Sequence, residues 1–165
     1  MGGMKMGDEN FAGLTFEQVV RKYKNTVGLV CIMRLKNQTD ADDCFQNTFL
    51  RLYKKSPKLE SEEHLKAWLI RVAINECNRF MRKNRKEVLL DKNSDDIVNF
   101  PYEECDLSWA LFELNDKYRE VMYLYYCENY KVNEIAKILK KPPNTIKTLL
   151  MRGREKLRSI YGGEC

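Results

Sequence analysis

Basic and amide side chains recur at helical spacing near the end of this 165-residue chain. Residues 132–157 read VNEIAKILKKPPNTIKTLLMRGREKL. One face of the second half of this stretch and its continuation is polar and basic, and it carries Asn144, Thr145, Lys147, Thr148, Met151, Arg152, Arg154 and Arg158. Such groups bind phosphate oxygens and base edges, so the chemistry they suit is nucleic-acid recognition. For this stretch alone, the alternative is a helical hairpin with a solvated basic face.

Two short helices are predicted to position these side chains. Ile135, Ala136 and Leu139 share one face of the first helix. Lys140-Lys141-Pro142 breaks that pattern, and Pro143 is tolerated in the first turn of a second helix. Apolar residues four and three apart then form its inner face, namely Ile146, Leu150, Gly153, Leu157 and Ile160. The spacing predicts a helix-turn-helix, whose second helix can lie in the major groove.

A second set of basic and amide groups lies on a helix predicted over about residues 62–85. The polar side of this helix carries Lys66, Arg71, Asn75, Asn78, Arg79, Arg82 and Lys83. Basic side chains can contact phosphates, and an aromatic can stack on an unpaired base. Trp68, on the apolar side, is therefore either a core residue or a wedge between bases. A solvated amphipathic helix is the alternative interpretation.

Two further helices are predicted before it. Thr15 and Gln18 form a capping box, and the helix that follows should run to about Lys36. Asp40 is the expected N-cap of the next helix, with two more acids in its first turn. The inward residues of this helix are Ala41, Cys44, Phe45, Thr48, Phe49 and Leu52. DADD lacks the loop and glycine of a calcium site, so no metal is expected.

An acidic stretch divides the chain. Residues 87–106 hold seven acids against one lysine, a balance of −6, with several helix breakers. Residues 131–160 carry nine basic and two acidic side chains, a balance of +7. Helices are expected at about 107–114 and 118–125 between them. The sequence therefore predicts an all-α fold of two small helical domains joined by a flexible acidic linker, the C-terminal one a helix-turn-helix.

Several functional classes are excluded by composition. No run approaches the ~20 apolar residues of a membrane span, and residues 1–13 lack a signal core, so a cytoplasmic location is expected. The six cysteines form no CxxC pair, and Cys31, Cys44 and Cys77 are expected to be small core residues. His64 has no nucleophile to serve and no phosphate loop is present, so we expect neither an enzyme nor a cofactor.

Three stretches, in this order, resemble a bacterial sigma factor of the sigma-70 family, within the extracytoplasmic-function class. They are DADDCFQNTFLRLYK at 40–54, LKAWLIRVAINECNRFMRKNRK at 65–86 and YREVMYLYYCENYKVNEIAKILKKPPNTIKTLLMRGREKLR at 118–158. The resemblance implies sigma region two over 15–86, a linker over 87–106 and region four over 107–161. Residues 1–14 and 162–165 would be tails.

The resemblance also implies the partners and the site residues. Core RNA polymerase would bind through its β′ clamp helices to Asp40, Asp43, Gln46, Phe49 and Leu52, and through its β flap to region four. The −10 element would contact Trp68, Asn75, Asn78, Arg79, Arg82 and Lys83, and a flipped base would enter the loop at 58–63. The −35 element would contact Asn144, Thr145, Lys147, Thr148, Arg152 and Arg154. An anti-sigma factor is a further expected partner, and the linker would thread the channel that later holds RNA.

Two departures from the family pattern affect the turn. The family usually has glycine where Lys140 stands and serine where Lys131 stands. Glycine suits a positive φ, so Lys140 either adopts that conformation or the turn differs. Two rival functions remain: a stand-alone helix-turn-helix repressor or activator, and an enzyme or RNA-binding protein with an appended helix-turn-helix. The first rival accounts for the helix-turn-helix but not for the other two stretches.

Overall fold

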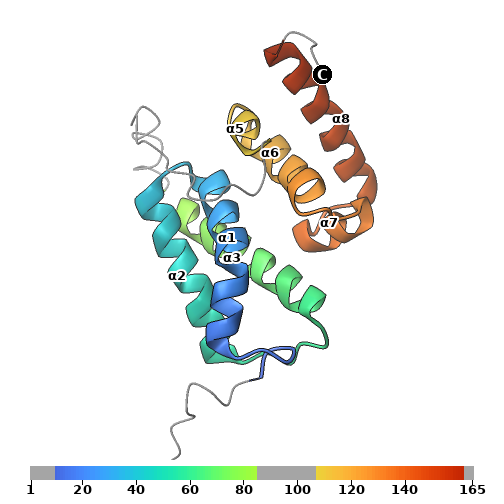
Figure 1. Ribbon diagram of the computed structural model, residues 1–165. Helices are drawn as coiled ribbons and strands as arrows, with labels where there is room; N and C mark the ends of the chain where they lie inside the picture. Colours follow the sequence, from blue (N-terminus) through green and yellow to red (C-terminus); the bar gives the residue numbers. More distant parts are fainter. Residues whose placement is uncertain (1–9, 85–106, 162–165) are drawn as a thin grey trace, which may run out of the picture. The chain divides into compact units, whose positions relative to one another are not determined.

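The computed structural model describes residues 10–84 and 107–161, and it is built from helices (Figure 1). The chain divides into two compact units, Met1–Asn99 and Phe100–Cys165. The two described ranges contain an isolated bridge between Phe11 and Leu14 but no β-strand, which agrees with the predicted all-α fold. The expected linker at 87–106 lies outside the described residues. No helix in the described ranges has the length and apolar character that crossing a membrane requires.

The first unit packs α1 (Phe16–Leu35), α2 (Gln38–Lys55) and α3 (Glu62–Lys83) against one another (Figure 1). The predicted capping box is confirmed at the start of α1. The Gln18 amide donates to Thr15 Oγ1 at 3.2 Å, and the Thr15 amide donates to Gln18 Oε1 at 2.9 Å. The helix ends at Leu35, one residue before the expected limit, because Lys36 is left-handed at φ 54°.

The start of α2 differs from the prediction. Asn37, not Asp40, is the N-cap, and its Oδ1 accepts the Asp40 amide at 3.0 Å. Asparagine caps a helix as well as aspartate does, so the helix begins three residues before the predicted N-cap. Asp40 then lies in the first turn, where the helix dipole still favours its charge.

Three cysteines meet in the core of the first unit, one from each helix. Cys31, Cys44 and Cys77 are buried free thiols, as the sequence predicted. The hydrogen bond with Cys77 and burial raise the pKa of the Cys44 thiol well above its usual range. The hydrogen bond with Cys31 and burial likewise raise the pKa of Cys77. Cys44 and Cys77 therefore stay protonated and act as packing residues.

The second unit contains α5 (Ser108–Leu111), α6 (Asp116–Met122), the π-helical turn η1 (Tyr123–Cys127), α7 (Val132–Leu139) and α8 (Pro143–Ile160). The helix expected at 107–114 is thus a single turn. The helix expected at about 118–125 begins at Asp116 and widens into η1 after Met122. Both α6 and α7 pack against α8, and this contact forms the core of the second unit (Figure 1).

A buried arginine ties the start of this unit together. Arg119 on α6 is 1% exposed. Its guanidinium donates to the carbonyls of Leu111 at 3.2 Å and Leu114 at 2.5 Å, and to Asp116 Oδ1 at 2.9 Å. Because carbonyls after a helix end lack intrahelical donors, Arg119 supplies the hydrogen bonds that close the turn between α5 and α6.

The helix-turn-helix turn forms without its usual glycine. Lys140 caps α7 in the left-handed conformation, at φ 55° and ψ 47°, so it accepts the backbone geometry that glycine would favour. At the start of α7, the Lys131 amide donates to Glu134 Oε2 at 2.9 Å, which replaces part of the missing serine cap. Pro143 occupies the first turn of α8 as predicted.

Candidate nucleic-acid interface

The outward stripe of α3 gathers most of the residues expected at the −10 element. Asn75 and Arg82 are exposed on the side opposite the buried Leu69 and Ala73. Arg79, with 61% of its side chain exposed, and Lys83 lie at the edge of α3 that faces α2. The helix therefore presents amide and cationic groups together to solvent, as binding to a nucleic acid requires.

Two of the predicted −10 residues, Trp68 and Asn78, are only partly exposed. Trp68 is half-buried, so its exposure is intermediate between that of a core residue and that of a wedge between bases, the two alternatives predicted from the sequence. Asn78 is also half-buried, because its Oδ1 accepts from Arg34 on α1, from Nε at 3.2 Å and from an Nη at 2.6 Å. That bond fixes the amide oxygen of Asn78 against α1.

The residues expected at the polymerase contact split between surface and core. Asp43 and Gln46 are exposed and Asp40 is partly exposed. Phe49 and Leu52, with exposed fractions of 5% and 0%, lie in the core of the first unit. They support α2 from inside and offer no surface to a partner in the folded domain.

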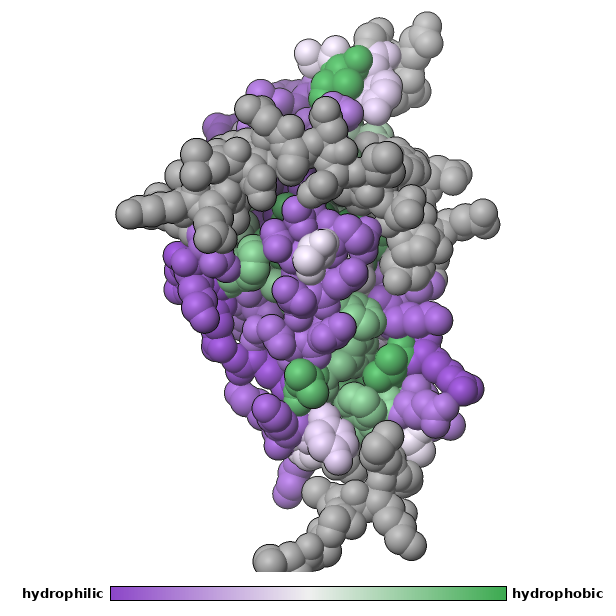
Figure 2. Space-filling view, turned by 90° about the vertical axis from the view of Figure 1, so that its left-hand side faces the viewer, coloured by the Kyte–Doolittle hydropathy of each residue, from purple (hydrophilic) through white to green (hydrophobic). Residues whose placement is uncertain are grey.

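The exposed apolar residues of α2 are neighbours of that buried pair. Leu50 is 49% exposed and Tyr53 is 37% exposed. Figure 2 views the molecule from the α2 side and shows hydrophobic side chains surrounded by hydrophilic ones. Leu50 follows Asp43 by seven residues and Gln46 by four, so all three share one outward face. That spacing was the signal in the sequence that could have found Leu50.

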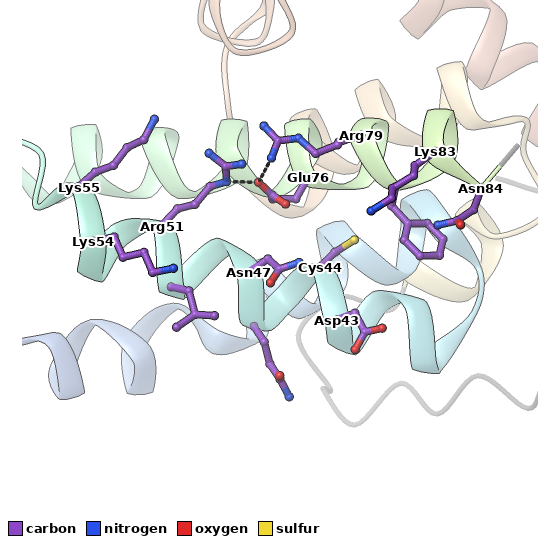
Figure 3. A pocket seen from close by; sticks show the side chains of 13 residues that line it. Asp43, Cys44, Asn47, Arg51, Lys54, Lys55, Glu76, Arg79, Lys83 and Asn84 are labelled. Carbon is purple, nitrogen blue, oxygen red and sulfur yellow. Dashed lines mark ion pairs between the residues drawn. The ribbon is translucent and has the colours of Figure 1, made fainter.

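A groove between α2 and α3 contains a carboxylate that the sequence pattern did not single out. Glu76 is 6% exposed, and Arg51 from α2 and Arg79 from α3 point toward it (Figure 3). Arg51 forms a close ion pair with Glu76, and Arg79 Nη1 lies 4.0 Å from the same oxygen. The carboxylate therefore joins the helix with the predicted polymerase contact to the helix with the predicted −10 contact.

The first two turns of α8 present the residues expected at the −35 element. Asn144, Thr145 and Lys147 are exposed, and Arg152 is exposed one turn farther on. Thr148 is half-buried, and its hydroxyl donates to the Asn144 carbonyl at 3.0 Å. The hydroxyl oxygen of Thr148 therefore remains available only as an acceptor. The side chains of Asn144, Lys147 and Arg152 can turn toward the major groove of DNA.

Arg154 is held differently from the other −35 candidates. Its Nε donates to the Tyr126 hydroxyl at 2.6 Å, and its guanidinium carbon lies 5.6 Å from the ring centres of both Tyr125 and Tyr126. The two tyrosines belong to η1 and were not among the residues predicted to contact the −35 element. No pattern of spacing links them to Arg154.

Comparison with known proteins agrees with this geometry. The family model of sigma-70 region 2 matches residues 19–87, and that of sigma-70 region 4 matches residues 110–157. SigV of Bacillus subtilis, an RNA polymerase sigma factor, is 30% identical over 75% of this chain and 77% of its own length. The chain belongs to the extracytoplasmic-function class of the sigma-70 family. This sigma factor is a transcription initiation factor that acts at specific promoters.

Two other relatives extend over nearly the whole sigma factor. SigM of Bacillus subtilis, an extracytoplasmic-function sigma factor, is 29% identical over 90% of this chain and 96% of its own. The sigma factor RpoE of Bartonella quintana, solved in complex with the anti-sigma factor NepR, superposes with a TM-score of 0.73 at 25% identity. That superposition covers 91% of this chain and 98% of RpoE.

Among residues 10–84 and 107–161, no group of His, Cys, Asp and Glu side chains could hold a metal ion.

Proposed function

We propose that this sigma factor binds core RNA polymerase through the outward face of α2 and reads two promoter elements, the −10 element with α3 and the −35 element with α8. The observation that carries the proposal is that each matched sigma region presents one helix whose exposed side is rich in amide and cationic groups. In this division of labour, 15–86 acts as region two, 107–161 as region four and 87–106 as the tether in the polymerase channel.

The polymerase surface is assigned to Asp43, Gln46 and Leu50. The acid supplies a charge-assisted contact, and Leu50 supplies an exposed apolar anchor of the kind that dominates interface energy. Phe49 and Leu52 take the supporting role that their burial dictates. The β′ clamp helices are the proposed partner of this face, and the β flap is that of region four.

The −10 role is assigned to Asn75, Arg79, Arg82 and Lys83, together with the half-buried Asn78 and Trp68. Melting costs a few kcal/mol per unstacked base, so the protein must offer contacts to the separated strand in return. Asn75 can read a base edge, while the cations follow the phosphates. The −35 role belongs to Asn144, Thr145, Lys147, Thr148 and Arg152, with Arg154 meeting backbone only.

Regulation by a partner protein and a cellular location are also proposed from the similarity to other sigma factors. The RpoE relative is bound by an anti-sigma factor in its crystal, and we propose that a protein of this kind also restrains the present sigma factor. Its work consists of binding and strand separation, without a catalytic step of its own. It would act in the cytoplasm, where RNA polymerase acts.

The first prediction tests the polymerase contact. Asp43→Lys combined with Leu50→Ala should weaken binding to core RNA polymerase more than about tenfold, because it reverses a charge and removes an apolar anchor. Both side chains are exposed, so helical content should not change. The measurement is co-purification of the full-length sigma factor with core polymerase, followed by titration.

Glu17→Lys on α1 is the matched control, since it makes the same charge change at an exposed acid on another helix. It should bind as the wild type does. If the double variant recovers as much core polymerase as the wild type, the outward face of α2 is not the polymerase surface. A wild-type protein that fails to bind core polymerase would contradict the proposed function as a whole.

A further inference from the structure

The tyrosine pair of η1 fixes the direction of Arg154. The π-helical turn places Tyr125 and Tyr126 edge to face, with ring centres 4.9 Å apart and planes at 75°. Both rings lie beneath the guanidinium, and the Tyr126 hydroxyl accepts the Nε–H. π-Helical turns of this kind are frequent at functional sites, because they redirect side chains that an α-helix would place elsewhere.

The residue before Arg154 explains why α8 comes so close to the tyrosines. A Cβ atom on Gly153 would lie 2.9 Å from Met122 Cγ and 3.1 Å from its sulfur. Only glycine therefore permits this approach without displacing Met122, the last residue of α6. Since η1 follows Met122 directly, the close contact places its tyrosines beside the next residue of α8, which is Arg154.

The partner of Arg154 orients the side chain without cancelling its charge. No acidic side chain in the described ranges pairs with Arg154, and the acceptor of its Nε–H is a neutral hydroxyl. Arginine has five N–H donors in a planar fork, so the other four remain for a second ligand. Tyr126 is 41% exposed, so the cluster lies at the surface. A fixed, uncompensated guanidinium at the surface suits a phosphate group.

Arg154 also lies on the side of α8 where a DNA backbone would pass. Lys147 precedes it by seven residues, so the two cations are two turns apart along one edge of the helix. The bases are nearest the N-terminal turns in this motif, and more distant cations meet phosphates. Arg154 is thus placed to hold the backbone while Lys147 reaches into the groove.

We infer that Tyr126 is a positioning residue for −35 binding: its hydroxyl holds Arg154 in the orientation that meets a phosphate of the −35 duplex. The inference rests on the −35 role proposed above for α8, and adds to it a residue outside the helix-turn-helix. Tyr126 acts through Arg154, and its own oxygen need not touch DNA. The hydroxyl, rather than the ring alone, is the part that matters.

The experiment compares Tyr126→Phe with Tyr161→Phe in holoenzyme reconstituted with core polymerase. Tyr161 is 48% exposed at the end of α8 and is the matched control. Binding to a −35 promoter duplex is measured across a salt series. Tyr126→Phe should lower affinity by about three- to tenfold at low salt, evenly across −35 sequences, because an oriented cation is lost. The salt slope should fall by up to about one, while Tyr161→Phe leaves both unchanged.

A second comparison separates positioning from packing. In an Arg154→Ala background, Tyr126→Phe should cause no further loss, because the hydroxyl then has nothing to orient. An equal loss in both backgrounds would overturn the inference and make Tyr126 a packing residue. An unchanged affinity and slope for Tyr126→Phe, with normal −35 selectivity, would overturn the role of Tyr126 alone. Absence of −35 selectivity in the wild-type holoenzyme would overturn the proposed function together with it.

Discussion

Lys147→Ala and Arg152→Ala are each expected to reduce initiation from a −35-dependent promoter by about tenfold to a hundredfold, with core polymerase binding intact. The reason is that both side chains are exposed near the bases, and a lost base contact typically costs ~1–3 kcal/mol at one position. The measurement is in vitro transcription by reconstituted holoenzyme from promoters in which each −35 base is varied. The loss should depend on the base at particular positions.

Arg154→Ala provides the comparison for these two variants. Because its guanidinium is held by Tyr126 and lies two turns beyond Lys147, where a phosphate contact is expected, its removal should cause a milder loss that is even across −35 sequences. If all three alanine variants lost activity evenly at every −35 sequence, α8 would act as a phosphate clamp. Base reading would then have to lie elsewhere in the chain.

Arg119→Ala is expected to destabilise the second unit by ~3–5 kcal/mol. The substitution removes the donor to the Leu114 carbonyl, one of the two donors to the Leu111 carbonyl, and the partner of Asp116. It also leaves a cavity where a side chain of 1% exposure had been. Hydrogen exchange measured by peptide should show lost protection in α6 and α8 and unchanged protection in α1–α3.

Two control variants accompany Arg119→Ala, namely the conservative Arg119→Lys and the exposed-site Arg158→Ala. Lysine keeps a charge but cannot reach all three acceptors in one plane, so it should recover only part of the stability. Arg158 is exposed, and its substitution should change the free energy of unfolding by less than about 0.5 kcal/mol. Equal protection of α6 in the wild type and Arg119→Ala would show that the buried hydrogen bonds do not hold the turn.

Local signals in the sequence predicted much of this fold. Thr15 and Gln18 marked the start of α1, and Pro143 marked the start of α8, because caps and fixed φ angles depend on neighbouring residues. Because the family's glycine is replaced by Lys140, either this residue had to adopt a positive φ or the turn had to differ. In the structure Lys140 is left-handed. The all-α fold also followed from periodicity alone. The N-cap of α2 was misplaced because Asn37, three residues before Asp40, is an equally favourable capping residue and was not considered.

The details of the candidate site depended on packing that the sequence does not reveal. Helical spacing placed Phe49 on the inward face, but the family resemblance assigned it to the polymerase contact; the structure buries Phe49 and exposes its neighbour Leu50. Asn78 contacts Arg34 across 44 residues of chain, and Tyr126 contacts Arg154 across 28. Such pairs are set by how helices approach one another, so helical spacing could not identify them.

Promoter selection by reconstituted holoenzyme tests directly whether this sigma factor reads two promoter elements. Core polymerase with this sigma factor is given a library of random promoter sequences, and the initiating templates are sequenced. We expect enrichment of two separated sequence blocks that requires the sigma factor, and Asn75→Ala should change preference in the downstream block only. Templates enriched equally without the sigma factor, or a duplex-binding preference that needs no core polymerase and yields no transcripts, would contradict it.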